Sequence, residues 1–184
     1  MGFHTFDVSR ADALEDPSRY EFLSVDELLA LLDPQLDDTI ADLGSGTGFY
    51  TDAIAPYVET LYAVDVQAAM HDAYREKGAP ENVDFVTAEV QDLPFDDDAL
   101  DGAVSTMTYH EFASPEASAE LARVIAPGGR LAIADWTAAG EGIEGPPVDE
   151  RYNAQTATEH LEAVGFEVVS AQDRRETFVL EAQR

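Results

Sequence analysis

One carboxylate and three glycines stand in residues 40–51, whose sequence is IADLGSGTGFYT. Gly44, Gly46 and Gly48 follow an apolar run and precede a helical pattern. Glycines in that context let a ligand lie against the main chain, near the free amide groups of a helix N-terminus. A dinucleotide turn of the GxGxxG type needs a small residue where this chain has Phe49. The spacing GxGxG therefore indicates a different ligand.

Two aspartates narrow the choice of ligand. Asp42 lies inside the apolar run, where a carboxylate is costly unless it meets a cation or several donors. A pyrophosphate would repel this carboxylate, whereas an ammonium group would not. Asp65 ends the next apolar run, where a carboxylate can accept hydrogen bonds from both hydroxyls of a ribose. S-adenosylmethionine, with a ribose, an amino group and a sulfonium charge, fits these residues better than NAD.

The elements that would position these residues alternate along the chain. Helical patterns near 48–56, 67–77 and 115–126 separate short apolar runs, which we predict to be strands, at 39–43, 61–65, 83–87, 99–107 and 130–136. Strands that are apolar throughout and separated by helices favour a parallel sheet buried on both faces, which is an α/β doubly wound fold. Ser24 and Glu27 have capping-box spacing for a further helix that Pro34 ends.

The C-terminal part of the chain breaks this alternation. Thr156 and Glu159 have capping-box spacing for a helix that ends at Gly165. The apolar runs at 166–172 and 177–183 are then too close together for a helical crossover. We therefore expect the sheet to end in an antiparallel pair.

The composition is strongly acidic and excludes several classes of function. The net charge is -28 with a single lysine, Lys77, so the surface repels phosphate backbones and a nucleic-acid substrate is disfavoured. Such charge is typical of a halophilic cytoplasm, where molar cations screen the self-repulsion. The chain has no cysteine and four scattered histidines, so we expect no metal site.

The 184 residues fit one domain, residues 1–184. No apolar run approaches the roughly 18 residues that a membrane span requires, and the first residues lack the pattern of a signal peptide. We therefore expect a cytoplasmic protein with no membrane partner. The sequence does not indicate an oligomeric state.

The order of these motifs resembles that of the class I S-adenosylmethionine-dependent methyltransferases, in particular small-molecule enzymes of the type 11 kind. ADLGSGTG is similar to the family's first motif and AVDVQ to its second, while VTAEVQDLPFDDDALDGAVS and ARVIAPGGRLAIADW are similar to the later segments. The resemblance implies a Rossmann-like, seven-stranded, mostly parallel sheet of order 3-2-1-4-5-7-6 with the seventh strand antiparallel. Residues 36–184 would then form the cofactor-binding core, and residues 1–35 an N-terminal lid and helix.

The resemblance also implies a cofactor site for S-adenosylmethionine. Asp42 would receive the ammonium group, Asp65 with Val66 the ribose, and Glu89 with Val90 the adenine. The methionine portion would lie against the glycine turn, residues Gly44, Ser45, Gly46 and Gly48.

The acceptor would bind after the fourth and fifth strands. His110 is the candidate base there, with Glu111 orienting it or binding a substrate cation, although His110 could equally be a cap or a packing residue. Tyr109 and Trp136 are candidate pocket walls, and His4 is a candidate lid residue. Further along, Arg151 could meet a substrate carboxylate or pair with Asp149 or Glu150.

Methyl transfer to a small-molecule acceptor is the function that these patterns favour. Two alternatives stay open at this point. One is a catalytically silent protein that binds S-adenosylmethionine, because the cofactor motifs are clearer than the acceptor motifs. The other is an NAD-dependent oxidoreductase, which Phe49 and Asp42 disfavour.

Overall fold

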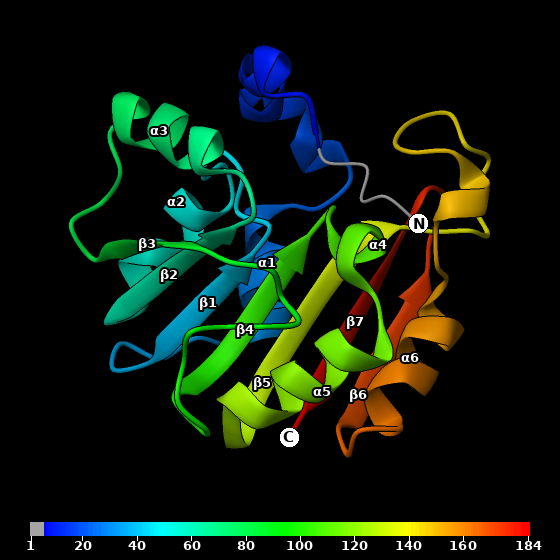
Figure 1. Cartoon of the computed structure of the whole chain (residues 1–184). Coiled ribbons are helices and arrows are strands. Elements are labelled where there is room, and N and C mark those ends of the chain that lie inside the picture. The colour runs from blue at the N-terminus through cyan, green and yellow to red at the C-terminus, as the bar shows by residue number, and fades with distance from the viewer. Residues whose placement is uncertain (1–5) are drawn as a thin grey trace.

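The structure, a computed structural model, describes residues 6–184. Seven strands of this part of the chain form one sheet of order β3-β2-β1-β4-β5-β7-β6 (Figure 1). The neighbours from β3 to β5 are parallel, and β7 is antiparallel to β5 and to β6. The predicted Rossmann-like fold and strand order are therefore confirmed. The strands are β1 (Thr39–Leu43), β2 (Thr60–Asp65), β3 (Val83–Thr87), β4 (Leu100–Thr106), β5 (Ile125–Trp136), β6 (Glu167–Asp173) and β7 (Thr177–Gln183).

Helices cover both faces of the sheet and bury a separate apolar core on each. Leu28, Ile54 and Tyr74 belong to one core, while Leu121 and Leu161 belong to the other, on the face that α5 and α6 cover in Figure 1. The α-helices are α1 (Val25–Leu32), α2 (Thr51–Ile54), α3 (Ala68–Lys77), α4 (Tyr109–Phe112), α5 (Pro115–Val124) and α6 (Ala154–Glu162). The 3-10 helices are η1 (Val8–Glu15), η2 (Pro17–Glu21), η3 (Ala55–Tyr57) and η4 (Val148–Glu150). None of these helices of the described chain is long and apolar enough to cross a membrane.

The helix starts agree with the sequence in one case and differ in another. Ser24 caps α1 as predicted, since its hydroxyl accepts the main-chain N–H of Glu27 at 3.2 Å. The predicted capping box at Thr156 is wrong, because α6 already begins at Ala154. Asn153 caps it, and its side-chain oxygen accepts the N–H of Thr156 at 2.8 Å. Asparagine caps helices as well as threonine does, and this one stands three residues earlier.

The helix after the glycine turn is shorter than the expected span of 48–56. Gly48 has φ +84°, a left-handed conformation that an α-helix cannot contain, so the helical turn starts only at Thr51. The helix then continues as η3, which contains Pro56. The long turn that results leaves residues 44–50 at the edge of the sheet.

The C-terminal strands form the antiparallel pair that their spacing predicts. β6 and β7 are joined by residues 174–176 only, and Asp173 lies opposite Phe178. β7 also pairs with β5, so that Asp135 stands beside Phe178 in the middle of the sheet. Because of this hairpin, Glu176 lies at the same edge of the sheet as the end of β5.

The N-terminal segment, residues 6–22, packs over the glycine turn and is tied to it by charged groups. Glu15 accepts a hydrogen bond from the Thr47 hydroxyl at 2.5 Å. The ammonium group of Lys77, the only lysine of the chain, lies 3.1 Å from Glu15 and 2.8 Å from Asp52. The ammonium therefore joins this segment to α2 and α3.

Candidate active site

A cavity of about 910 Å³ opens at the carboxyl ends of the parallel strands. Its lining comes from the ends of β1 to β5, from the N-terminal segment, and from residues 143–150. Ligands of doubly wound sheets bind at this edge, where the strand order reverses between β1 and β4. The volume lies within the range of small-molecule sites, about 300 to 1,000 Å³.

The glycine turn has three left-handed residues with different surroundings. A Cβ on Gly44 would lie 2.2 Å from the Thr108 side chain, and one on Gly48 would lie 2.1 Å from the Tyr74 ring. Those two glycines therefore allow the turn to pack closely on the protein itself. Gly46, with φ +55°, meets only Leu14 of η1, at 3.3 Å. Gly44, Ser45 and Gly46 line the cavity, whereas Gly48 is not among the lining residues.

Asp42 lies in β1 behind the turn and does not line the cavity. Only 1% of the residue is exposed, and its Oδ2 accepts the Thr51 hydroxyl at 2.6 Å. Its Oδ1 and the Ser45 hydroxyl are buried without a hydrogen-bond partner among residues 6–184. Burial raises the pKa of Asp42 to about 6. Two acceptors without donors at this turn fit a ligand that brings hydrogen-bond donors or positive charge.

Asp65 ends β2 beside the turn and holds it in place. Its Oδ2 accepts the N–H of Gly46 at 2.9 Å, and its Oδ1 accepts the N–H of Gln67 at 2.8 Å. Burial raises the pKa of Asp65, although both amide groups act in the opposite direction. Each carboxylate oxygen has a second lone pair, so it can accept a further donor from a ligand. Val66, next in the chain, is 45% exposed and lines the cavity.

The segment after β3 adds the lining on the far side of Asp65. Glu89 and Val90 both line the cavity. Val90 is buried, and the Glu89 carboxylate accepts a hydrogen bond from the Gln91 side chain. The structure therefore brings the turn, Asp65 and Glu89 to one wall, as the sequence motifs predict.

In another part of the cavity lining, His110 forms a close pair with Asp135. The imidazole Nδ1 lies 2.9 Å from Asp135 Oδ2, and the same oxygen accepts the main-chain N–H of His110 at 2.6 Å. Asp135, at the end of β5, is fully buried, whereas His110 lines the cavity. A carboxylate at Nδ1 favours the tautomer with the proton on that nitrogen, which leaves Nε2 free to accept a proton.

Two effects compete at His110. Burial lowers the pKa of the imidazole, but the hydrogen bond and charge of Asp135, with the charge of Glu111, outweigh burial and raise it. Glu111 lies beside it, with Oε1 3.9 Å from the His110 Nε2. Burial raises the pKa of Glu111 to about 7, against the effect of His110. This wall therefore holds groups that exchange protons near neutral pH.

Of the proposed pocket residues, Trp136 lines the cavity and Tyr109 does not. Tyr109 is buried beneath α4, where its hydroxyl lies 2.9 Å from the His160 Nδ1. The ring of Trp136 contacts Phe22 of the N-terminal segment, with centroids 4.8 Å apart. The remaining lid candidate, His4, lies outside the described residues.

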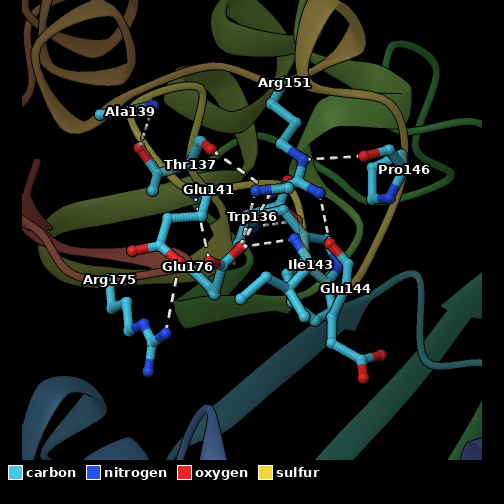
Figure 2. Close-up of polar contacts among 12 residues, drawn as sticks. Trp136, Thr137, Ala139, Glu141, Ile143, Glu144, Pro146, Arg151, Arg175 and Glu176 are labelled. Carbon is cyan, nitrogen blue, oxygen red and sulfur yellow. Dashed lines mark hydrogen bonds and ion pairs between the residues drawn. The ribbon is translucent and has the colours of Figure 1, made fainter.

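Arg151 does not line the cavity, and its guanidinium points into the loop before η4 (Figure 2). Only 1% of its side chain is exposed, and its guanidinium lies 3.7 Å from the carboxylate of Glu176. Neither Asp149 nor Glu150, the neighbours considered from the sequence, forms this pair. The sequence reasoning did not include Glu176, which is distant in the chain.

Two further residues of the site were not predicted. Asp135, like Asp42, is a carboxylate within an apolar strand, where a charge without a partner is costly. The cost that identifies Asp42 as a candidate site residue therefore applies to Asp135 as well. Arg19 lines the cavity from η2, with its guanidinium 5.0 Å from the centroid of the Phe49 ring. No comparable pattern in the sequence marks Arg19.

Comparison with known proteins gives a consistent result. The methyltransferase domain family matches residues 41–133. The crystal structure of a SAM-dependent methyltransferase from Aquifex aeolicus superposes with a TM-score of 0.87 at 30% identity, covering 97% of this chain and 98% of that one. An O-methyltransferase of Penicillium expansum is 31% identical, covering 88% of this chain and 66% of the relative.

A demethylmenaquinone methyltransferase of Clavibacter sepedonicus is 34% identical over 106 residues. That match covers 56% of this chain and 43% of the relative. The chain therefore spans less than half of the length of this curated relative. The similarity is concentrated in the part that contains the glycine turn and the strands beside it.

Proposed function

The chain belongs to the methyltransferase domain family, and on that premise we propose that it transfers the methyl group of S-adenosylmethionine to a small-molecule acceptor. The observation that carries the proposal is the His110–Asp135 pair, because His110 lines the same cavity as the glycine turn. The glycine turn, where the cofactor would bind, and His110, which would accept a proton, therefore line one cavity. We call the part of the lining with the glycine turn, Asp65 and Glu89 the cofactor wall, and the part with His110 and Trp136 the acceptor wall. The cavity volume, about 910 Å³, is sufficient for a cofactor and a small acceptor together.

The residues of the cofactor wall fit this cofactor. The ammonium group would lie toward the Asp42 Oδ1 and the Ser45 hydroxyl, which have no hydrogen-bond partner among residues 6–184. Gly46 and Asp65 would meet the middle of the molecule, with Glu89 at the adenine end. When bound, S-adenosylmethionine supplies a methyl group on a sulfonium sulfur, which an in-line nucleophile can displace. Phe49, which lines the cavity beside Arg19, occupies the position where a dinucleotide turn would need a small residue.

His110 acts as the general base in this proposal. Its Nε2 would accept the proton that an acceptor group loses on methylation, and Asp135 would hold the ring and stabilise its charged form. Glu111 is close enough to influence the charge on the ring. This arrangement favours an acceptor whose reacting group carries a removable proton, such as a hydroxyl. The O-methyltransferase relative agrees with such an acceptor.

The acceptor is a small molecule rather than a nucleic acid in this proposal. The net charge of -28 opposes binding of a phosphate backbone. Of the cavity-lining residues within 6–184, only Arg10 and Arg19 carry a permanent positive charge. Among the curated relatives, a demethylmenaquinone methyltransferase is named for a small-molecule reaction, whereas a probable tRNA methyltransferase of Mus musculus is named for a nucleic-acid reaction.

The test combines cofactor binding with an acceptor screen. Isothermal titration should detect S-adenosylmethionine binding and no comparable NAD binding. A screen of methyl transfer over a metabolite panel, run in parallel with His110→Ala, should then find an acceptor that only the unmodified protein methylates rapidly. Cofactor binding with no acceptor methylated anywhere in a broad panel would support the catalytically silent alternative. Binding of NAD alone would refute the proposal.

We also propose that the acidic composition is an adaptation to a cytoplasm with a high concentration of salt. The charge of -28 on 184 residues makes self-repulsion large, and cations screen it. Circular dichroism during thermal unfolding should give a higher Tm in 3 M KCl than in 0.1 M KCl. Equal stability in both would contradict a halophilic origin.

A further inference from the structure

The loop of residues 137–147, between β5 and η4, forms a wall of the cavity next to Trp136. Ile143, Glu144, Gly145 and Pro146 of this loop are lining residues. The loop contains no strand and no α-helix, and its turns depend on left-handed glycines. Something other than regular secondary structure must therefore hold it in position.

Arg151 supplies one half of that support. Its guanidinium donates to the main-chain oxygen of Pro146 at 2.8 Å, to that of Glu144, and to that of Thr137 at 3.5 Å (Figure 2). These oxygens belong to the start and the end of the loop. An arginine fork can satisfy several acceptors at fixed angles, which a lysine cannot do. Its side chain is 1% exposed, so the contacts are shielded from water.

Glu176, from the turn between β6 and β7, supplies the other half. Its carboxylate accepts the main-chain N–H groups of Glu141 at 3.2 Å, Gly142 at 3.1 Å and Ile143 at 3.3 Å. The same carboxylate lies 3.7 Å from Arg151. A buried ion pair contributes little stability by itself, but here both partners also satisfy main-chain groups of one loop. We call Arg151 and Glu176 the loop clasp.

The loop clasp also fixes the surroundings of Trp136. The guanidinium of Arg151 lies 5.5 Å from the centroid of the indole. A Cβ on Gly145 would lie 2.4 Å from the indole, so the loop main chain packs directly on the ring. Moving the loop would therefore move the wall that Trp136 and Gly145 form together.

Ile143 adds a large apolar side chain to this wall. The residue is 63% exposed, although its N–H group is held by Glu176. Its side chain lines the cavity, so an apolar ligand that covered it would remove apolar surface from water. The contrast is strong in a protein with a net charge of -28.

We propose that Arg151 and Glu176 are positioning residues for acceptor binding, which hold Ile143 and Trp136 as an apolar wall for an acceptor with an uncharged, apolar body. They act through the loop and touch neither the acceptor nor the cofactor. The inference rests on the proposed function, because it takes this end of the cavity as the acceptor end. It assigns Arg151 to the loop rather than to a substrate carboxylate.

The sole tryptophan provides a direct measurement, because the intrinsic fluorescence of Trp136 reports on this wall. The probe is 4-nitroanisole, a neutral methyl ether whose nitro group quenches tryptophan emission. Its Kd is measured by quenching in the presence of S-adenosylmethionine, and the Kd of S-adenosylmethionine is measured separately by isothermal titration. The variants are Ile143→Ser, which removes the apolar contact, and Arg151→Lys and Glu176→Gln, which weaken the loop clasp.

Each of the three variants should raise the Kd of 4-nitroanisole by about fivefold or more, as expected when a buried apolar contact is lost. The Kd of S-adenosylmethionine should stay within about twofold, because the cofactor wall is built from other elements. Hydrogen exchange of the Gly142 and Ile143 amides should quicken in Glu176→Gln and Arg151→Lys but not in Ile143→Ser. A general loss of structure would instead raise the Kd values of 4-nitroanisole and S-adenosylmethionine together.

Arg175→Ala is the matched control. Arg175 also joins the β6–β7 turn to the loop, through a contact of 3.2 Å with the Glu141 side chain, but both side chains are largely exposed (Figure 2). An exposed ion pair contributes little, so this variant should leave both Kd values unchanged. Should Glu176→Gln fail to fold, Arg151→Lys and Ile143→Ser still test the inference.

Two results would overturn the inference while leaving the proposed function intact. One is an unmodified protein that binds S-adenosylmethionine but not 4-nitroanisole. The other is unchanged binding of 4-nitroanisole in the loop-clasp variants. Failure of the proposed function has a different signature, since the unmodified protein would then not bind S-adenosylmethionine.

Discussion

The cofactor wall of the cavity is held by main-chain groups, whereas the acceptor wall is held by ionisable side chains. On the first, the amides of Gly46 and Gln67 donate to Asp65, and left-handed glycines set the shape of the turn. On the second, His110 depends on Asp135, and Arg151 depends on Glu176. Main-chain N–H donors keep their protons near neutral pH, whereas His110 can gain or lose one. Substitutions on the two walls should therefore differ in what they change, the first affecting cofactor affinity and the second affecting rate and pH dependence.

The largest expected effect is on the acceptor wall. Asp135→Asn should lower kcat by about 10²- to 10⁴-fold, the usual contribution of a positioned general base, because the amide can no longer stabilise a charged His110. The Kd of S-adenosylmethionine should be nearly unchanged. Steady-state kinetics with the acceptor found in the screen, together with isothermal titration, would measure both. A large loss of cofactor affinity would remove the distinction between the walls.

The second-largest expected effect is a loss of cofactor affinity when the cofactor wall is changed. Asp65→Ala should weaken S-adenosylmethionine binding by about tenfold or more, through loss of charge-assisted contacts of roughly 1.5 to 3 kcal/mol. Isothermal titration measures it, and Asp84→Ala on an exposed face of β3 serves as the control. If affinity were unchanged in Asp65→Ala, the role of this wall would have been assigned wrongly.

Asp42→Asn should change binding and stability in opposite directions. The folded-state pKa of Asp42, about 6, lies above its ordinary value of 3.8, so the native state holds this proton more tightly than the unfolded chain does. Stability is therefore lost as the pH rises from about 4 through 6, and the substitution should restore about 1 to 3 kcal/mol at pH 8. Affinity for S-adenosylmethionine should fall at the same time.

Urea denaturation at pH 5 and pH 8 tests the stability part of this prediction, and titration with cofactor tests the other. The gain should be larger at pH 8 than at pH 5. A variant that is less stable at pH 8 would show that the buried carboxylate stabilises the fold instead of serving the ligand.

The smallest expected effect is a shift of the pH profile. His110 must be neutral to act as a base, so kcat/KM should rise with pH through a pKa above the ordinary 6.5. Glu111→Gln removes one of the charges that raise this pKa, and the rising limb should move toward lower pH. A matched set of pH–rate profiles would measure the shift. A limb that moved to higher pH would contradict the assignment of His110 as the base.

The sequence could predict where most residues of the cofactor wall lie in the fold, because their signals are local. The bounds of β1, β3 and β7 agree with the runs at 39–43, 83–87 and 177–183. Gly44, Asp65 and Glu89 each lie at the end of a strand or within two residues of it, and parallel strands bring their carboxyl ends to one edge. The strand order then follows from the family resemblance.

The acceptor wall was predicted less completely because its contacts are not local. Arg151 has two acidic neighbours in the sequence, yet its partner is Glu176, which only the β6–β7 hairpin brings near. Tyr109 lies next to His110 in the chain but points into the core, since consecutive residues of an α-helix point about 100° apart. Tertiary packing decides which partner a side chain meets and whether it points into the core. The order of residue types along the chain does not specify that packing.

The bridge that Lys77 makes between the N-terminal segment and α2 has a chemical consequence. A chain with one lysine has one side-chain amine, so an acylating reagent at neutral pH can modify the side chains at this position alone. Acylation would leave Glu15 and Asp52 facing each other without the ammonium that now separates them. An amine-reactive dye would thus label one side chain, beside the segment that covers the glycine turn, in addition to the α-amino group of the chain.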